Sequence, residues 1–286
     1  MLIKRMLMLF FRDRANVFFS LLAVLIIIGL YVLFLGHSLE QSLRAALGFD
    51  ANQIGLVVAS VTLAGMIAVA SVTSCLGALG VSIADKQNAA KDFFTSPVAR
   101  WKITLGYVLG SAVVGLVMTL IALILCVTYI TAKGGALPGA ADCGRLLLTV
   151  ILSVLCGNGM MFFVALLIKS QSAFAALSTV TGTLIGFLMG IYIPVGSLPQ
   201  GVQWVIKCFP PAHGASMFKQ VLADSQMSQL LAGAPPETLV KFRETFGVVF
   251  AYGGYVSNFW FSALILAATA VLFYGLSAVI MQTRRT

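Results

Sequence analysis

The chain has 286 residues, of which 60% are hydrophobic and only 9% are charged, against about 25% charged residues in an average soluble domain. This composition excludes a soluble globular enzyme and indicates a protein of the lipid bilayer. The net charge of +9 would favour nucleic acid as a partner of a soluble protein, but here the basic residues flank long apolar runs, which is typical of membrane proteins.

The first 36 residues combine a basic lead with an apolar run. In residues 1–15, Lys4, Arg5 and Arg12 recur at helical spacing among leucine, isoleucine and phenylalanine side chains. This pattern predicts an amphipathic interfacial helix with its basic side on anionic lipid, and a plain flanking tail is the alternative. The run that follows is longer than the roughly 7 to 15 residues of a signal-peptide core and has no clear cleavage site, so we expect an uncleaved span.

Six charge-free runs are long enough to cross a bilayer. A helix rises about 1.5 Å per residue and the hydrocarbon core is about 30 Å thick, so a span needs about 20 apolar residues. The predicted spans cover about residues 17–36, 53–84, 103–131, 146–168, 171–193 and 257–281. Pro194 and Pro199 are expected to end the fifth span, because proline interrupts a helix. The sequence therefore predicts an all-α integral membrane protein with a single transmembrane domain over residues 1–286.

The basic residues predict the orientation of the spans. Six spans place both ends of the chain on one side, and with both ends in the cytosol the inner segments hold 11 of the 18 Lys and Arg residues. The short outer segments hold only Arg44, Lys133 and Arg145. The other four lie in the outer segment 194–256, and long translocated segments largely escape the positive-inside rule. Both termini are therefore expected in the cytosol, in a multi-pass protein of the cytoplasmic membrane.

The outer segment 194–256 begins with a short apolar piece around Trp204, which prolines bracket on both sides. Non-helical backbone at membrane depth needs cover from protein or a water-filled cavity, so we expect this piece to dip into the outer face beside the fifth span. A helix from about 215 to 231 and another from about 237 are expected to follow. A disulfide between Cys143 and Cys208, both expected on the outer side, is an open alternative to two free thiols.

Several kinds of chemistry are missing from the sequence. No Asp, Glu, Lys, Arg or His lies inside a predicted span, which disfavours ion-coupled transporters and intramembrane hydrolases. His37 and His213 are both expected at outer boundaries. His37 with Glu40 could form half of a metal or acid–base site, but a solvated outer loop is the favoured interpretation of this pair. No GxxxxGK[ST] phosphate loop occurs in these residues. We therefore expect no catalytic residue, no metal site and no cofactor bound by this chain.

Hydroxyl and small side chains mark the second and fifth spans. The hydroxyls that could line a path are Ser60, Thr62, Ser71, Thr73 and Ser74, and Ser178, Thr179, Thr181 and Thr183. The alternative is that they bond the backbone of their own helix. The fifth span also has small residues at a spacing of four, namely Ser178, Gly182, Gly186 and Gly190. This stripe predicts a face for close packing against a helix of this chain or of a second copy.

Residues 85–102, DKQNAAKDFFTSPVARWK, form a polar stretch between two apolar spans. They predict a short helix over 86–94 with Asp85 near its start, followed by a new helix with Ser96 as its N-cap and Pro97 at its first position. Arg100 with its two neighbours would anchor this helix at the lipid surface. The exposed pair Phe93-Phe94 would insert into a partner or lie on the bilayer.

Taken together, these segments resemble the membrane subunit of type 2 ATP-binding-cassette (ABC) exporters, a permease family that includes bacterial drug and polysaccharide exporters. The resemblance covers nearly the whole chain. It rests on the six spans with both ends inside and on the segments KRMLMLFFRDRANVFFSLL, KDFFTSPVARWKI and GSLPQGVQWVIKCFPP.

The resemblance implies a role for several of these residues. The loop between the second and third spans would be a coupling helix that docks on the ATPase, and the loop after the fourth span would be a second contact. The residues implied in this coupling are Lys91, Asp92, Phe93, Phe94 and Arg100, with Lys169 and Gln171 in the second contact. A path along the second and fifth spans would close at an outer gate near Pro194, Pro199 and Trp204.

The resemblance also implies partners and a function. A separate ABC ATPase subunit, in two copies, would bind ATP and magnesium, and a second permease, identical or related, would complete a dimer in the membrane. The function expected is export of a hydrophobic or amphipathic substrate, such as a drug, a peptide antibiotic or a lipid, by alternating access. A glycan exporter of the same family, a secondary transporter or channel without an ATPase, and a membrane-embedded enzyme are the alternatives.

Overall fold

The computed structural model describes residues 2–14, 17–18, 22, 25–26, 29, 51–94, 100–168, 170–233 and 235–283; for residues 2, 51, 52, 85–94, 100 and 101 it describes the backbone alone. The predicted first span, 17–36, lies outside these residues apart from the isolated positions, as do His37, Glu40 and Arg44.

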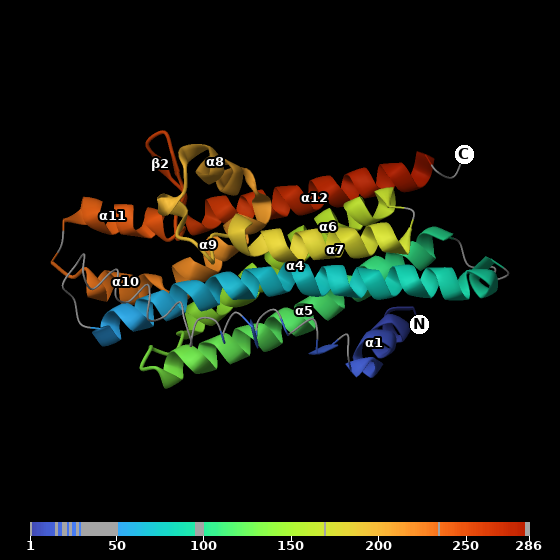
Figure 1. The fold of residues 1–286 in the computed structure, drawn as a ribbon, viewed down its shortest axis with the longest axis horizontal. Helices are drawn as coiled ribbons and strands as arrows, with labels where there is room; N and C mark the ends of the chain where they lie inside the picture. Colours follow the sequence, from blue (N-terminus) through green and yellow to red (C-terminus); the bar gives the residue numbers. More distant parts are fainter. Residues whose placement is uncertain are drawn as a thin grey trace.

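Five described helices are long and apolar enough to cross a membrane (Figure 1). They are α4 (Ala51–Phe94), α5 (Arg100–Ala132), α6 (Ala140–Leu167), α7 (Gln171–Leu188) and α12 (Phe259–Thr283). They correspond to the second to sixth predicted spans, because each of those runs lacks the charges that would forbid burial in hydrocarbon. The class of all-α membrane protein is thereby confirmed.

Helix α4 is the centre of the bundle, with α5, α6, α7 and α9 packed around it. In its most apolar stretch 89% of the residues are buried. Small residues allow the neighbouring helices to come close: a Cβ at Gly157 of α6 would lie 2.9 Å from the Val72 side chain, and one at Gly115 of α5 would clash with Cys75.

The predicted separate helix over 86–94 is wrong, because α4 runs without interruption through these residues to Phe94. The physical reason is that VSIADKQNAAKDFF, from Val81 to Phe94, contains neither glycine nor proline, so nothing stops the helix that precedes it. Asp85 is therefore an interior residue of α4 and not a cap. With 44 residues, α4 is about 66 Å long.

Helix α7 ends at Leu188, about five residues before the end predicted from Pro194. Gly190 has a φ of +60°, its N–H donates to the Phe187 carbonyl at 3.0 Å, and the Ile191 N–H donates to the Gly186 carbonyl at 3.1 Å. These two bonds form a Schellman motif, which requires a left-handed residue that only glycine adopts at no cost. The glycine, and not the prolines, ends the fifth span.

The outer segment folds into η2 (Val195–Ser197), α8 (Gln200–Cys208), α9 (Pro210–Leu222), α10 (Asp224–Leu230), α11 (Pro236–Thr245) and the strands β1 (Ala251–Tyr252) and β2 (Tyr255–Val256). The strands are antiparallel, with Ala251 opposite Val256, and Gly253 and Gly254 both have positive φ in the turn between them. Instead of one helix over 215–231, α9 begins at Pro210, a favoured first position, and α10 follows a break at Ala223.

Helix α9 is not a surface element but lies among α4, α6 and α12. Ten of its residues are buried, from Pro211 to Leu222. The sequence PPAHGAS allows this, because its small side chains leave room for neighbouring helices on every side. The outer segment therefore contributes one helix to the interior of the bundle.

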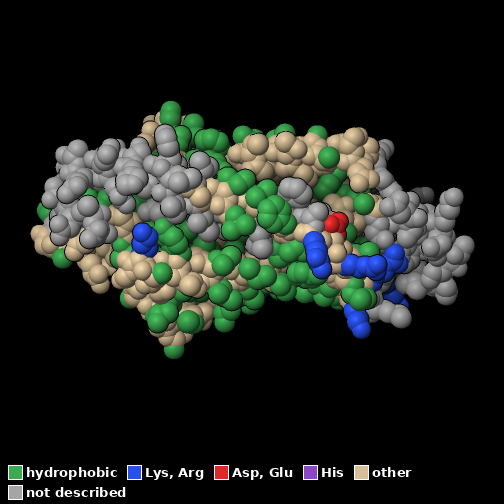
Figure 2. Space-filling model, turned by 60° about the horizontal axis from the view of Figure 1, so that its bottom comes forward, with side chains coloured by type: hydrophobic (Ala, Val, Ile, Leu, Met, Phe, Trp, Pro, Cys, Tyr) green, Lys and Arg blue, Asp and Glu red, His purple; other side chains and the backbone are tan. Residues whose placement is uncertain are grey.

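Helix α1 (Leu2–Arg12) packs against α5 and α4 through Met6 and Phe10, which are fully buried, while Lys4 and Arg12 are exposed. Figure 1 shows α1 and the C-terminal end of α12 at one end of the bundle, and α10 and α11 at the other. On the face shown in Figure 2, hydrophobic side chains cover the middle, and most of the visible Lys and Arg side chains gather towards the end with α1.

Candidate functional site

The hydroxyls of α4 that were predicted as path residues are buried among other helices. Ser60, Thr62, Ser71 and Ser74 are at most 4% exposed. Ser71 donates to the Ala68 carbonyl at 2.7 Å, whereas the hydroxyls of Ser60 and Ser74 have no hydrogen-bond partner among the described residues. Within one copy of the chain, these side chains face packed protein and not an open path.

The hydroxyls of α7 bond the backbone of their own helix, and some of them also lie on its uncovered side, so both predicted arrangements occur together. Ser178, Thr179 and Thr183 donate to backbone carbonyls four residues earlier, at 2.9 to 3.1 Å. Thr179 and Thr183 nevertheless lie on an uncovered side of the helix, and Thr181 is half-buried. In the most apolar stretch of α7 only 17% of the residues are buried, so most of this helix has no neighbour within the chain.

The stripe of small residues on α7 divides into two parts. No atom lies within 4 Å of a Cβ built at Gly182, whereas a Cβ at Gly186 would clash with the Tyr192 ring. Gly190 is the helix cap described above. The prediction that all of these glycines form one packing face is therefore wrong, because Gly186 packs against Tyr192 of the turn after α7, and Gly190 caps the helix.

The residues of the predicted outer gate lie at the start of the outer segment. Pro194 precedes η2 and Pro199 precedes α8. Trp204 of α8 is 47% exposed, and its ring lies 6.1 Å from that of Tyr252 and 5.5 Å from the Lys207 Nζ. With Val202 and Val205, which are also exposed, Trp204 forms an apolar outward face of α8.

His213, expected at an outer boundary, is a buried residue of α9. Its Nε2 lies 3.1 Å from the Lys207 carbonyl and its Nδ1 lies 3.2 Å from the Ser262 hydroxyl. A carbonyl can only accept, so Nε2 carries the proton and Nδ1 accepts from Ser262. Burial lowers the pKa of His213, which keeps this neutral tautomer. The residue thus ties α8 and α9 to α12.

Lys219 is a second buried polar residue of α9, and no sequence pattern predicts its burial. Its Nζ donates to the Phe246 carbonyl at 3.0 Å and to the Gly190 carbonyl at 3.3 Å. These carbonyls stand at the C-terminal ends of α11 and α7, where helix dipoles favour a cation. Burial nevertheless lowers the pKa of Lys219 to about 7. This side chain joins the outer segment to the end of the fifth span.

A polar cluster that sequence reasoning missed links α5, α6 and α12. Asn158 is fully buried; its Nδ2 donates to the Ser111 hydroxyl at 2.7 Å, and its Oδ1 accepts from the Tyr274 hydroxyl at 2.9 Å. Hydrogen bonds between side chains of this kind hold neighbouring membrane helices together. The signal that could have found the cluster is a single asparagine within an apolar span.

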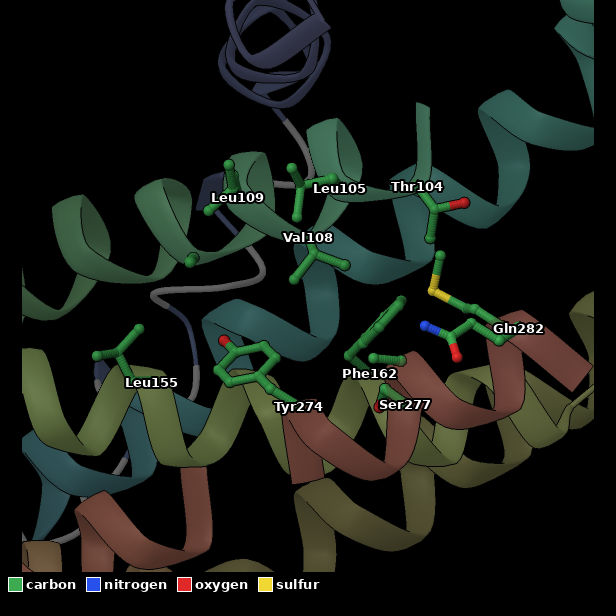
Figure 3. Close-up of a pocket in the computed structure, with 12 residues that line it drawn as sticks. Thr104, Leu105, Val108, Leu109, Leu155, Phe162, Tyr274, Ser277 and Gln282 are labelled. Atoms are coloured by element: carbon green, nitrogen blue, oxygen red, sulfur yellow. The ribbon is translucent and has the colours of Figure 1, made fainter. Parts of the chain in front are cut away.

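Two cavities lie between helices of the bundle. One, of about 530 Å³, lies among α5, α6 and α12 beside Tyr274 (Figure 3). The other, of about 640 Å³, lies among α1, α4 and α7 and is lined by Arg12, Asp13, Gln171 and Phe174, among others. Gln171 is thereby the one predicted coupling residue whose side chain the structure places.

The other predicted coupling residues are described only in part. The backbone of Lys91, Asp92, Phe93 and Phe94 forms the last turn of α4, while their side chains and that of Arg100 lie outside the described residues, as does the whole of Lys169. The part of the chain that the structure describes holds no group of three or more His, Cys, Asp or Glu that could bind a metal ion. Cys143 and Cys208 are free and exposed.

The apolar helices, the buried polar contacts between them and the basic flanks define a multi-pass α-helical membrane protein. A family model for ABC-2 family transporter proteins matches residues 57–279, which is more than half of the chain. The chain therefore belongs to the ABC-2 transporter family and is a permease of the ABC class, a membrane subunit of a kind that works with an ATPase partner. No curated protein matches the chain.

Proposed function

We propose that this permease exports a hydrophobic or amphipathic substrate, such as a drug, a peptide antibiotic or a lipid, across the cytoplasmic membrane by alternating access. A separate ATPase chain, in two copies, binds ATP and magnesium, and two permeases, in the simplest case identical, form the membrane part. Both termini and the end of α4 lie in the cytosol in this proposal. The outer segment with Pro194, Pro199 and Trp204 lies on the other side.

The observation that carries the proposal is the length and continuity of α4. One helix passes from the outer segment, where it packs against α9 and α10, to Lys91–Phe94 at the end of the bundle near α1. A tilt imposed on its inner end is transmitted to the outer end, because no break lies between them. Coupling between two sites requires an element that both can bias, and in this proposal α4 is that element.

The uncovered side of α7 supports a second permease and a path beside it. Val180, Leu184 and Phe187 are each at least 50% exposed, and Thr179 and Thr183 lie among them. An apolar surface with scattered hydroxyls suits an amphipathic substrate better than a long glycan, which would use aromatic platforms. The open position Gly182 allows close approach of the second copy.

The coupling role is tested by breaking α4 beyond the membrane. Asn88→Pro removes a helical hydrogen bond and clashes with the preceding turn, at a cost of about 3 kcal/mol, whereas Asn88→Ala keeps the helix. We expect substrate-stimulated ATP hydrolysis by the reconstituted complex to be lost in the proline variant and kept in the alanine variant. Phe93→Ala with Phe94→Ala should cut the same stimulation, while Phe11→Ala at the same end of the bundle should not.

Membrane insertion and assembly with the ATPase are measured in parallel, so that loss of the complex is not read as loss of coupling. Equal stimulation in the proline and alanine variants would contradict transmission through α4. Purification from native membranes provides a second test, since absence of any co-purifying ATPase would favour a secondary transporter or channel instead.

The permease dimer is tested at Gly182. In a background with Cys143→Ser and Cys208→Ser, Gly182→Cys should form a cross-linked dimer in membranes on mild oxidation. Leu147→Cys serves as a control because it lies on a different helix and is 50% exposed. Equal cross-linking of the two variants would argue against a dimer through α7.

A further inference from the structure

The cavity among α5, α6 and α12 has the volume of a ligand site. Its volume of about 530 Å³ lies within the range of roughly 300 to 1,000 Å³ that small-molecule pockets occupy. Helices α5 and α12 each pack against α6, and the cavity is the space left between them. Leu105 and Leu109 at its edge are 48% and 44% exposed, so the cavity opens sideways, towards the surface that faces the bilayer.

The wall of this cavity already satisfies its own hydrogen bonds at membrane depth. The Tyr274 hydroxyl donates to Asn158, and the Ser277 hydroxyl donates to the Phe273 carbonyl at 2.7 Å. Val108, Leu155 and Phe162 supply an apolar surface around them (Figure 3). An occupant with polar atoms here would lose its bonds to water without replacement, so the wall favours hydrocarbon.

One end of the cavity is more polar than the other. Figure 3 shows Thr104 and Gln282 at the same end, opposite Leu155. Lys102, which is exposed, lies two residues before Thr104 near the start of α5, and Gln282 is exposed one residue before the end of α12. This end therefore lies where these helices leave the apolar layer, at the level of lipid headgroups, and it carries a cation that attracts anionic lipid.

We propose that this cavity binds one acyl chain of an anionic bilayer phospholipid. The headgroup lies beside Lys102 and Gln282, and the chain runs past Val108 and Phe162 towards Leu155. The occupant is a bilayer lipid and not a transported molecule, because the cavity opens towards hydrocarbon and its described lining contains no charged side chain. The polar groups of this lining at membrane depth, Tyr274 and Ser277, already donate within the protein. The bound chain fills the gap between α5 and α12 and stabilises their common packing on α6.

The test uses the full chain in nanodiscs of phosphatidylethanolamine with a minor fraction of phosphatidylglycerol. Some of the phosphatidylglycerol carries a diazirine in the middle of one acyl chain, and peptide mass spectrometry locates its adducts after illumination. We expect adducts concentrated on the cavity residues of α5, α6 and α12. Adducts no more frequent there than around Val271, which is 74% exposed on α12 outside the cavity, would overturn the proposal.

Filling the cavity provides the matched comparison. Ala278→Phe should reduce labelling of α5 and α6 cavity residues several-fold, whereas Val271→Phe on the same helix should leave it unchanged. Ala112→Leu fills the cavity from α5 and gives a second variant should Ala278→Phe fail to fold. Undiminished labelling in a folded filled variant would refute the site.

The headgroup assignment has its own readout. Lys102→Gln should reduce labelling by the phosphatidylglycerol probe several-fold and leave labelling by a phosphatidylcholine probe with the same chain unchanged. An equal effect on both probes would refute selection of an anionic headgroup. None of these measurements involves transport or ATP hydrolysis, so they stand apart from the test of the exporter.

Discussion

Replacing Lys219 by methionine should change how the stability of the protein depends on pH. Burial lowers the pKa of this amine from 10.5 to about 7. Between these two values the unfolded chain binds a proton at Lys219 that the folded chain does not bind, so the free energy of unfolding rises with pH across this window. Methionine has a similar length and no proton to exchange, so Lys219→Met should abolish this contribution.

The magnitude follows from the difference between the two pKa values. One pKa unit corresponds to about 1.4 kcal/mol, and between pH 7 and pH 9 the charged form is increasingly lost from the folded protein alone. The wild type should therefore gain about 2 kcal/mol relative to Lys219→Met, which corresponds to roughly 5 °C in the unfolding midpoint. Loss of the bonds to Gly190 and Phe246 lowers the stability of the variant at every pH and does not alter the slope.

Thermal unfolding in detergent, followed by tryptophan fluorescence at pH 7, 8 and 9, measures this slope. Lys241→Met is the matched control, because it removes an exposed lysine of α11 while leaving Lys219 in place. We expect Lys241→Met to follow the wild type and Lys219→Met to depart from it. If the unfolding midpoint of all three proteins depended on pH in the same way, the claim that burial lowers the pKa of Lys219 would be refuted.

Three further predictions concern packing and orientation. Gly186→Ala should destabilise by about 1–3 kcal/mol, because its Cβ meets the Tyr192 ring, whereas Gly275→Ala, where no atom lies within 4 Å of the added Cβ, should stabilise α12 by up to about 1 kcal/mol; thermal midpoints distinguish the two. Asn158→Leu should cost about 1–3 kcal/mol by leaving the Tyr274 hydroxyl unpaired, and adding Tyr274→Phe should recover part of this loss in a double-mutant cycle; strict additivity would deny the contact. A membrane-impermeant maleimide should label the exposed Cys143 and Cys208 in intact cells, but not the buried Cys75, Cys126 and Cys156; labelling of the first two only after permeabilisation would reverse the orientation.

The long helices could be predicted from the sequence because a charge-free run leaves few choices in a bilayer. The ends of α5 and α12 follow from where the charges resume. The end of α7 was misplaced because proline is the more conspicuous signal, while the real stop is one glycine whose left-handed conformation depends on the residues around it. Similarly, the change from apolar to polar residues predicts a separate short helix over 86–94, whereas α4 continues through them because no glycine or proline interrupts it.

The buried polar residues of α9 could not be found from pattern alone. A segment with His213 and Lys219 has the composition of a surface helix. Only the packing of α9 against its neighbours shows that both side chains form hydrogen bonds with carbonyl or hydroxyl groups inside the bundle. Asn158 differs, because an amide within an apolar span is expensive unless another helix bonds it. The position of Asn158 in an apolar span therefore predicts a hydrogen-bond partner on another helix, but it does not identify the residue.

The early end of α7 has a consequence for the membrane around it. Its 18 residues extend about 27 Å, slightly less than the roughly 30 Å of an average hydrocarbon core, whereas the 33 residues of α5 extend about 50 Å. A helix this short stands nearly upright, or the bilayer thins beside it, while α5 must lean or project. Among the five described spans α7 is the shortest, so the bilayer beside its uncovered side needs to thin more than beside the other four, and thinner lipid is a lower barrier to an amphipathic molecule.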